Sequence, residues 1–394
     1  MEKQMPKVTI KNSAKNKFLH GYPLIRKEEV LDVQVTNDWV DFVDEKDRFI
    51  AKGYLGEQNK GIGWILSLKN VPIDYHFFMQ KFEQAKQERS TYFYSQDTDT
   101  FRIFNGEGDG IGGMTVDYYN GYAVVSWYNA TIYHHRQLIM DSFLKVYPEI
   151  IGIYEKNRFK SDLPESNHFY GRKAPEPLIV KENNVQFATY LNEGWMTGIF
   201  LDQHEVRGRL VDGLAMGKRV LNMFSYTGAF SVAAAFGGAS STTSVDLAKR
   251  SLEKTKEQFA VNGFTLENHK IHVMDTFDYF RYAKKKGLQF DVIVLDPPSF
   301  ARNGKKVFSV AKNYGDLIAN SLPILADQGI IIASTNASNV PLAKFQKMIE
   351  KSFQSGQVKC HLLESHHLPA DFKTNSHYEE SDYLKVLIYQ KVSK

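Results

Sequence analysis

Asp291-Val-Ile-Val-Leu-Asp-Pro-Pro-Ser-Phe300 is a short apolar run that ends abruptly in an acid, two prolines and an aromatic residue. The run has the length and composition of a buried strand. Pro297 and Pro298 lack a backbone N–H and have a fixed φ, so the chain after Asp296 neither extends a sheet nor starts a helix without strain. Rigid loops at the carboxyl ends of strands are where open α/β sheets bind ligands. The stretch therefore predicts a reaction site, with Asp296 as its carboxylate and Phe300 as a ring that stacks on a base.

The second half of the chain repeats this pattern of short apolar runs with helical segments between them. Such alternation predicts a βαβ series, and hence an α/β fold with a mostly parallel sheet, that begins near residue 205. The helical segment 247–262 ends before Gly263, where a glycine often terminates a helix. The predicted strands are 220–224, 242–245, 271–274, 292–295, 330–333, 358–363 and 383–389.

The first half of the chain has a different pattern. Short strands between glycine-rich turns up to residue 72 predict a small, closed, all-β domain, and the apolar spacing over 75–88 predicts a connecting helix. A strand-rich α+β unit follows, and Glu182-Asn-Asn184 predicts a hairpin turn. We therefore predict three domains, 1–72, 73–190 and 191–394. The expected strands are 7–10, 29–34, 49–54 and 63–67 in the first domain and 101–105, 113–118, 122–127 and 150–154 in the second, with a helix over 134–146.

The amino-acid composition restricts the number of domains, the compartment and the kinds of partner that the protein can have. With 394 residues, of which 43% are hydrophobic, the chain can form two or three globular domains. Its one cysteine, Cys360, excludes an internal disulfide and a multi-cysteine metal site, and it fits a reducing compartment. Residues 1–29 are locally basic although the net charge is only +4, which favours either a nucleic-acid contact or a solvated basic face. The chain shows no apolar leader and no run long enough to span a membrane, so we expect a cytoplasmic protein.

The turn after the first strand of the α/β half indicates the cofactor. It reads Asn222-Met-Phe-Ser-Tyr-Thr-Gly228 and lacks the closely spaced glycines that a pyrophosphate needs, which disfavours a dinucleotide. Asp246 ends the next strand, 18 residues after Gly228, where an acid accepts hydrogen bonds from ribose hydroxyls. Asp275 follows the third strand and can accept from an adenine amino group, although either acid alone is more often a helix N-cap. Together they predict an adenosine without phosphates, such as S-adenosylmethionine, bound by Phe224, Ser225, Tyr226, Thr227, Gly228, Asp246, Asp275 and Asp296.

These motifs resemble the class I S-adenosylmethionine-dependent methyltransferases that modify 23S ribosomal RNA, and specifically the RlmI-like family. The resemblance extends over nearly the whole chain, through 101–111 with Thr115-Val-Asp117 and through Thr197-Gly-Ile-Phe-Leu-Asp-Gln203. It implies a small β-barrel PUA-like domain, a central α+β domain and a Rossmann-like catalytic domain. It also implies Gln203 as a cofactor contact and S-adenosylhomocysteine as a product. The expected partner is 23S ribosomal RNA or a large-subunit precursor, recognised by shape and phosphates; a homodimer is left open, and no membrane or metal is expected.

The chain departs from the family where the methylated atom is decided. Cytosine-5 methylation needs a cysteine thiolate that adds to the ring, and the family places this cysteine where Asn336 stands here. Cys360 belongs to a later strand, where a small buried hydrophobe is the expected role. A purine nitrogen needs only alignment of nucleophile, methyl group and sulfur, and Asn336 can read a base edge. We predict guanine N7, with cytosine-5 as the alternative, and Asp296, Pro297, Pro298, Phe300 and Asn336 as catalytic residues.

Other classes of function stay open at this point. A nicotinamide-dependent oxidoreductase conflicts with the missing glycine motif, and a nonenzymatic RNA-binding protein would have no need of the acids from Asp246 to Asp296. Methylation of a protein or a small molecule would not explain the additional N-terminal domains. Segment 366–377 contains three histidines without the spacing of a metal site, and it is expected to form a polar loop over the active face.

Overall fold

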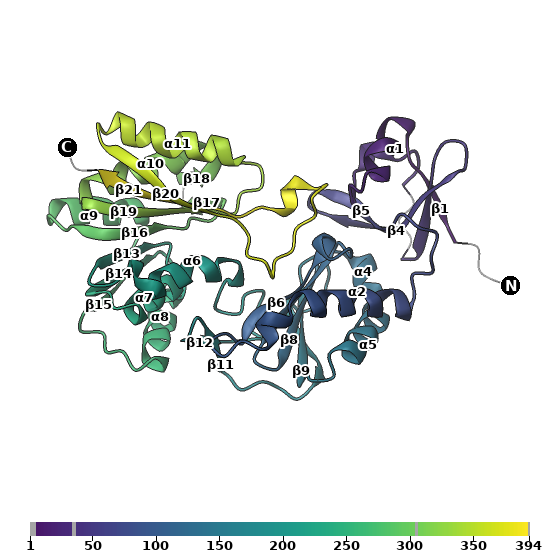
Figure 1. Ribbon diagram of the computed structural model, residues 1–394, viewed down its shortest axis with the longest axis horizontal. Coiled ribbons are helices and arrows are strands. Elements are labelled where there is room, and N and C mark those ends of the chain that lie inside the picture. Colours follow the sequence, from purple (N-terminus) through teal and green to yellow (C-terminus); the bar gives the residue numbers. More distant parts are fainter. Residues whose placement is uncertain (1–4, 34–36, 304–305, 393–394) are drawn as a thin grey trace. The chain divides into compact units, whose positions relative to one another are not determined.

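The computed structural model describes residues 5–33, 37–303 and 306–392, without the side chains of 301–307 (Figure 1). The chain folds into two compact units, and each unit gathers segments that are distant in sequence. Unit 1 comprises Met1–Val180, Thr189–Thr197 and Ala370–Ser381, and unit 2 comprises Lys181–Ala188, Gly198–Pro369 and Asp382–Lys394. The division of the chain into three domains stays a prediction.

Unit 1 begins with a five-stranded sheet in the order β1-β3-β4-β5-β2, in which β1 and β3 are parallel. Three of the four predicted strands are confirmed, but 29–34 has no strand in its described part. Helix α1 and strand β3 were not predicted. Ala14 and Phe18 of α1 are buried four residues apart, but lysines between them hide this stripe in the sequence. The bounds are β1 (Lys7–Thr9), α1 (Asn12–Leu19), β2 (Leu24–Ile25), β3 (Trp39–Val43), β4 (Phe49–Gln58) and β5 (Gly61–Ser67).

The basic residues near the start of the chain are largely neutralised. Acidic side chains of unit 1 that lie farther along the sequence pair with most of them, so this surface has less positive potential than its sequence suggests. The ion pairs are Lys7–Asp47, Lys15–Asp44, Lys17–Glu29 and Arg26–Glu380.

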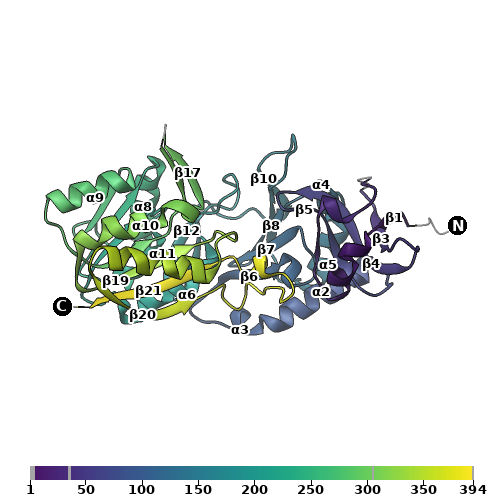
Figure 2. The ribbon, with the colours of Figure 1, turned by 90° about the horizontal axis from the view of Figure 1, so that it is seen from above.

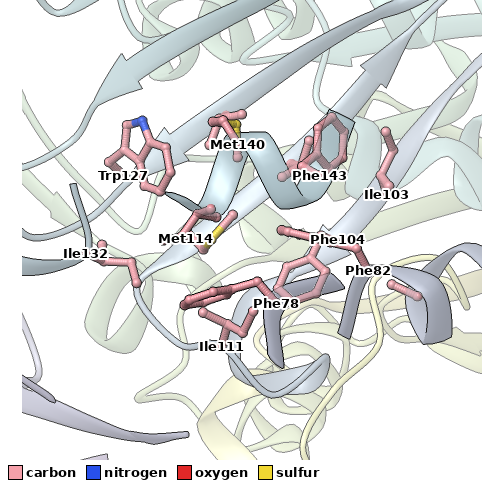
Figure 3. Close-up of a cluster of buried hydrophobic side chains, with 14 of the residues drawn as sticks. Phe78, Phe82, Ile103, Phe104, Ile111, Met114, Trp127, Ile132, Met140 and Phe143 are labelled. Atoms are coloured by element: carbon pink, nitrogen blue, oxygen red, sulfur yellow. The ribbon is translucent and has the colours of Figure 1, made fainter. Parts of the chain in front are cut away.

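A second sheet, in the order β10-β9-β8-β7-β6, carries the main core of unit 1. Figure 3 shows Phe78 and Phe82 of α2 among the buried side chains, with Phe143 of α5 and Phe104 of β6. The Phe82 ring lies 5.1 Å from that of Phe104 and 5.3 Å from that of Phe143. The predicted connecting helix is therefore confirmed, with its apolar face buried. The bounds are α2 (Tyr75–Glu88), α3 (Ser90–Phe93), β6 (Thr100–Asn105), β7 (Met114–Tyr119), β8 (Tyr122–Trp127), α4 (Ala130–His134), α5 (Arg136–Val146), β9 (Gly152–Asn157) and β10 (Ser166–Gly171).

Segment Ala370–Ser381, although it comes from the C-terminal part of the sequence, is held within unit 1. Arg89 and Asp109 form a buried bidentate ion pair, with N–O distances of 2.7 and 3.2 Å. Arg89 also donates to the backbone carbonyl of Asp371 at 2.7 Å. The Asp371 carboxylate accepts from the backbone N–H of Arg102 at 2.8 Å. We call Arg89, Arg102, Asp109 and Asp371 the clasp.

Segment 366–377 was expected to form a loop over the active face, and its residues from 370 onward belong to unit 1. Lys373 forms an ion pair with Glu88. A Cβ added at Gly108 would lie 1.8 Å from the carbonyl oxygen of Lys373, so the glycine-rich turn there allows the segment to approach closely. The local sequence carried no sign of these contacts.

Unit 2 contains a seven-stranded sheet in the order β15-β14-β13-β16-β19-β21-β20. The first five strands are parallel, as the βαβ pattern predicts. Strand β21 is antiparallel to both of its neighbours, β19 and β20. Side chains of β16 alternate between two cores, one with α6 and α7 and one with α9, α10 and α11 (Figure 1). The bounds are α6 (His204–Arg209), β13 (Arg219–Met223), α7 (Ala229–Phe236), β14 (Ser241–Asp246), α8 (Arg250–Val261), β15 (His269–Val273), α9 (Thr276–Lys285), β16 (Phe290–Leu295), α10 (Val310–Ser321), β19 (Leu325–Thr335), α11 (Leu342–Ser355), β20 (Lys359–His366) and β21 (Lys385–Val392).

Two hairpins complete the fold. Strands β11 (Leu178–Glu182) and β12 (Val185–Thr189) meet at the predicted turn, where Asn183 and Asn184 adopt positive φ. Strands β17 (Phe300–Asn303) and β18 (Lys306–Ser309) pair directly after the Asp-Pro-Pro motif and project from the sheet (Figure 2). Within the described residues, no helix combines the length and the apolarity needed to cross a membrane.

Candidate active site

A cavity of about 790 Å³ opens in unit 2 at the carboxyl ends of the parallel strands. Segments that follow β13, β14, β15, β16 and β19 meet there, because the carboxyl ends of parallel strands share one edge of the sheet. The lining residues are Ile199, Phe200, Asp202, Gln203, Arg207, Phe224, Ser225, Tyr226, Ala229, Phe230, Asp246, Leu247, Ala248, Asp275, Thr276, Phe277, Asp296, Pro297, Pro298, Phe308, Asn313, Asp316 and Asn336.

Most of the site residues expected from the sequence line this cavity, and three do not. Thr227 is buried and its hydroxyl donates to the carbonyl of Gly198 at 2.6 Å. Gly228 precedes α7 with a φ of +81°. Phe300 lies on the hairpin strand β17 and is 60% exposed. The expected residues that do line the cavity are Gln203, Phe224, Ser225, Tyr226, Asp246, Asp275, Asp296, Pro297, Pro298 and Asn336.

The loop after β13 is strained and firmly held. Phe224 and Tyr226 have φ values of +57° and +52°, in the left-handed region that side chains rarely adopt. The backbone N–H of Ser225 donates to the carbonyl of Val245 at 3.0 Å. The N–H of Tyr226 donates to the Asp246 carboxylate at 2.8 Å. Strain of about 1–3 kcal/mol at each residue persists only where the surroundings impose it, and such sites are commonly functional.

The two acids after β14 and β15 have structural partners and also face the cavity. The Asp246 carboxylate accepts from Tyr226 and from the backbone N–H of Ala248, both at 2.8 Å. Asp275 is the N-cap of α9 and accepts from the N–H of Phe277 at 3.0 Å. Both carboxylates line the cavity. Because each carboxylate oxygen can accept more than one hydrogen bond, capping leaves them able to bind ligand donors.

The carboxyl group of Asp296 has a raised pKa. Burial raises its pKa to about 6, and hydrogen bonds from Ser334 and Gln203 partly offset that effect. The charge of Asp202 raises the pKa further, whereas the charge of Arg207 lowers it. A carboxylate that is disfavoured in the empty cavity gains most from a positively charged ligand.

Two buried polar atoms of cavity residues have no hydrogen-bond partner among the described residues, namely Gln203 Oε1 and Ser225 Oγ. The amide nitrogen of Gln203 donates to Ser334 Oγ at 3.1 Å, so its oxygen is the end left unpaired. Both residues line the cavity and are at most 6% exposed. An unpaired buried polar atom costs about 1–3 kcal/mol, which a ligand can recover by supplying the partner.

Asn336 lies directly after β19. Its Oδ1 accepts from the hydroxyl of Ser299 at 2.6 Å, and the residue is exposed and lines the cavity. The hydrogen bond orients the amide, so that its two N–H groups are the end suited to meeting an acceptor.

Sequence reasoning missed two of the lining residues that matter most. Arg207 is buried, lines the cavity and forms a bidentate pair with Glu182 at 2.6 and 2.8 Å. It follows Gln203, the N-cap residue of α6, by four residues, and this helical spacing is a signal that could have found it. Phe200, 43% exposed, lines the cavity and lies 5.3 Å from the ring of Tyr226.

The only cysteine lies away from these groups. Cys360 is on β20, the edge strand of the sheet, and is not among the residues that line the cavity. Burial, with a smaller contribution from Glu350, raises the pKa of its thiol. Its raised pKa disfavours the reactive thiolate.

The residues present fit S-adenosylmethionine. Asp246 and Asp275 can accept from the ribose and adenine, and Phe277 offers an apolar surface for the ring. The methionyl end carries an ammonium and a carboxylate, which match the unpaired Gln203 Oε1 and the cation of Arg207. Among the described residues, no group of three or more His, Cys, Asp or Glu side chains could hold a metal ion.

Comparisons with known proteins agree with this geometry. Residues 156–388 match the family model of the S-adenosylmethionine-dependent methyltransferases, and residues 8–68 match a PUA-like domain. YwbD of Bacillus subtilis, named as a candidate ribosomal RNA large subunit methyltransferase, is 48% identical over 98% of this chain and 100% of its own length. Ribosomal RNA large subunit methyltransferase I of Aeromonas salmonicida is 30% identical, over 94% of this chain and 96% of its own.

Two solved structures resemble the whole chain. A crystal structure of a candidate methyltransferase complexed with SAH has a TM-score of 0.92 and 44% sequence identity, over 98% of this chain and 100% of that one. A candidate SAM-dependent methyltransferase from Streptococcus mutans has a TM-score of 0.90 and 43% identity over the same shares. Both likenesses therefore extend over unit 1 and unit 2.

Proposed function

The chain belongs to the S-adenosylmethionine-dependent methyltransferase family, and on that premise we propose that it methylates a base of 23S ribosomal RNA, with guanine N7 as the preferred atom. S-adenosylmethionine is the cofactor, and S-adenosylhomocysteine is the product left after transfer. The proposal has two parts, the RNA substrate and the methylated atom, and different observations support each.

The RNA substrate is supported by the relatives and by the N-terminal domain. The proteins from B. subtilis and A. salmonicida that align with nearly the whole chain are named for ribosomal RNA of the large subunit. The match to a PUA-like domain at 8–68 adds a fold suited to binding structured RNA by shape and phosphates. A small-molecule substrate would leave this domain without a role.

The single observation that carries the choice of atom is the amide at position 336. Cytosine-5 methylation needs a thiolate beside the base, and the cavity presents Asn336 there instead. Cys360 does not line the cavity, and its raised pKa disfavours a thiolate. Guanine carries O6 beside N7, so the N–H groups of Asn336 can donate to O6 while N7 faces the methyl group.

The remaining chemistry is alignment and electrostatics. Bound S-adenosylmethionine supplies a methyl group activated by a positively charged sulfur. Asp246 and Asp275 hold the adenosine, and Pro297 and Pro298 fix the loop that positions the base. Gln203 and Arg207 bind the methionyl end.

In this proposal the carboxylate of Asp296 acts electrostatically, by stabilising positive charge. Methylation at N7 removes no proton, and the positive charge of the sulfonium passes to the purine. The Asp296 carboxylate lines the cavity and would stabilise positive charge on either bound group. Phe300, exposed next to Ser299, stacks on a base outside the cavity.

The test compares ribosomal RNA from the wild-type strain and from a strain without the gene. Nuclease digestion and mass spectrometry should show the loss of one 7-methylguanosine from 23S ribosomal RNA, restored by the wild-type gene and by Cys360→Ala but not by Asp296→Asn. Loss of 5-methylcytosine with methylguanosines intact would replace guanine N7 by the cytosine-5 alternative. Unchanged ribosomal RNA would reject the RNA substrate itself.

A further inference from the structure

An exposed tryptophan in unit 1 is held in a fixed position from three sides. Trp195 is 46% exposed, and its indole N–H donates to the carbonyl of Asn157 at 3.0 Å. Its own carbonyl accepts from Arg158 Nη2 at 2.6 Å. The preceding carbonyl, of Gly194, accepts from the ammonium of Lys156 at 2.5 Å. A large aromatic side chain that is both exposed and immobilised loses little entropy when a flat ligand binds it.

The cations that hold this tryptophan carry charge that is only partly compensated. Arg158 donates to the hydroxyl of Ser126 and to the Trp195 carbonyl, and among the described residues it forms no ion pair. Lys156 is buried, and desolvation together with the charge of Arg158 lowers its pKa to about 8. Glu165 and Glu193 attract Lys156, so the uncompensated charge beside Trp195 is that of Arg158.

Phe159 follows Arg158 in sequence and packs against the core of unit 1. It is half-buried, and its ring lies 5.5 Å from that of Tyr133. The combination of an exposed aromatic face with a guanidinium that forms no ion pair among the described residues is what proteins use to bind single-stranded nucleic acid, where the base stacks and the phosphate contacts the cation.

We propose that Trp195 and Arg158 form a nucleotide-binding shelf, on which a base of the RNA substrate stacks while its phosphate contacts Arg158. The inference rests on the proposed RNA substrate. Trp195 and Arg158 both lie in unit 1, which also contains the match to a PUA-like domain.

The test uses the full-length protein, a 23S ribosomal RNA transcript and an unstructured RNA oligonucleotide of mixed sequence. Trp195→Ala should weaken binding of both RNAs roughly 5- to 150-fold, the range found when one stacked base is lost, and Trp195→Phe should recover most of the affinity. Arg158→Gln should also weaken binding and make it less sensitive to salt. Tyr94→Ala, which removes another exposed aromatic ring of unit 1, should leave RNA binding unchanged.

Tryptophan fluorescence gives a direct readout. The chain has four tryptophans, of which Trp64 and Trp127 are buried and Trp39 is half-buried and stacked on His135. Stacking of a base should therefore quench mainly Trp195, and Trp195→Phe should remove most of the RNA-induced quenching. Titration with S-adenosylhomocysteine should give the same affinity in every variant, because the shelf contributes nothing to the cofactor cavity.

The outcomes separate this inference from the proposed function. If the wild-type protein binds and methylates RNA and Trp195→Ala does so equally well, the shelf is refuted and the proposed function stands. If Trp195→Ala raises the KM for RNA with little change in kcat, and the fluorescence change depends on Trp195, the shelf is supported. If the wild-type protein binds no RNA, both are refuted.

Discussion

The clasp of unit 1 and the cavity of unit 2 both contain buried polar side chains. These side chains are paired with each other in the clasp, whereas in the cavity some of them have no partner in the part of the chain that the structure describes. In the clasp, Arg89 and Asp109 satisfy each other at 2.7 and 3.2 Å. In the cavity, Gln203 Oε1 and Ser225 Oγ lack partners among the described residues, and Asp296 has a pKa raised to about 6 by burial. Satisfied groups maintain the fold, whereas unsatisfied ones are tolerated where a ligand completes them. Substitutions in the two regions should therefore separate stability from activity.

The largest effect on stability is expected in the clasp. Asp109→Asn leaves the Arg89 guanidinium buried without its counter-charge, which should lower the free energy of unfolding by about 3–5 kcal/mol. Chemical denaturation measures the change. Glu149→Gln removes the partly exposed pair with Lys86 in the same unit and should change stability by less than about 1 kcal/mol. Equal effects of the two substitutions would contradict the description of the clasp as a buried, paired site.

In the cavity, loss of a buried charge should reduce activity without reducing stability. Asp296→Asn should slow methyl transfer by about 10²-fold or more, as expected when a preorganised charge is lost from a reacting site. The free energy of unfolding should stay the same or rise, because burial already disfavours this carboxylate. Transfer rates and denaturation curves of one preparation test both statements, with the exposed Asp278→Asn as a control for an acid outside the cavity. A loss of stability that parallels the loss of activity would assign Asp296 a structural role.

The pH dependence of cofactor binding follows from the same carboxylate. Its pKa lies near 6 in the folded protein, above the ordinary 3.8, so the unfavourable charge is absent below about pH 4 and fully present above about pH 6. Stability of the cofactor-free protein should therefore fall across that window, other groups being equal. A positively charged ligand favours the ionised form, so affinity for S-adenosylmethionine should rise with pH through about 6.

Calorimetric titration between pH 5 and 8 measures this rise, at up to about tenfold per pH unit below 6. S-adenosylhomocysteine lacks the sulfonium charge and should show a weaker dependence. Asp296→Asn should flatten both profiles. A dependence that persists in Asp296→Asn would point to another titrating group.

The fold could be predicted where its causes are local. The β16 strand and helix α2 follow from apolar spacing within a single segment, and both lie where expected. The placement of Ala370–Ser381 could not be predicted, because it depends on contacts such as Arg89 to Asp371, which are 282 residues apart in sequence. Helix α1 was missed because its buried stripe consists of only Ala14 and Phe18.

The residues of the site also fall into two groups, those that the local sequence predicts and those that depend on contacts between distant segments. Acids that directly follow parallel strands, such as Asp246 and Asp296, must lie at one edge of the sheet, so their order in the sequence was sufficient to bring them together. Arg207 reaches the cavity from α6 and is oriented by Glu182 on a hairpin, a relation that no local pattern encodes. Phe300 lies outside the cavity lining because the chain enters the β17–β18 hairpin at that residue.

The smallest expected effect tests the comparison most directly. A serine-to-alanine substitution should lower the stability of the protein in unit 1 and raise it in the cavity. Ser142 in unit 1 is buried and its hydroxyl donates to the carbonyls of Leu138 and Tyr75, so Ser142→Ala should lower stability by about 1 kcal/mol. Ser225 in the cavity is also buried, but its Oγ has no hydrogen-bond partner among the described residues. Ser225→Ala should raise the stability of the cofactor-free protein by up to about 1 kcal/mol and weaken cofactor binding by about fivefold. If both variants lose stability alike, the unpaired hydroxyl of Ser225 is satisfied in solution, and the cavity holds its polar groups for the fold rather than for a ligand.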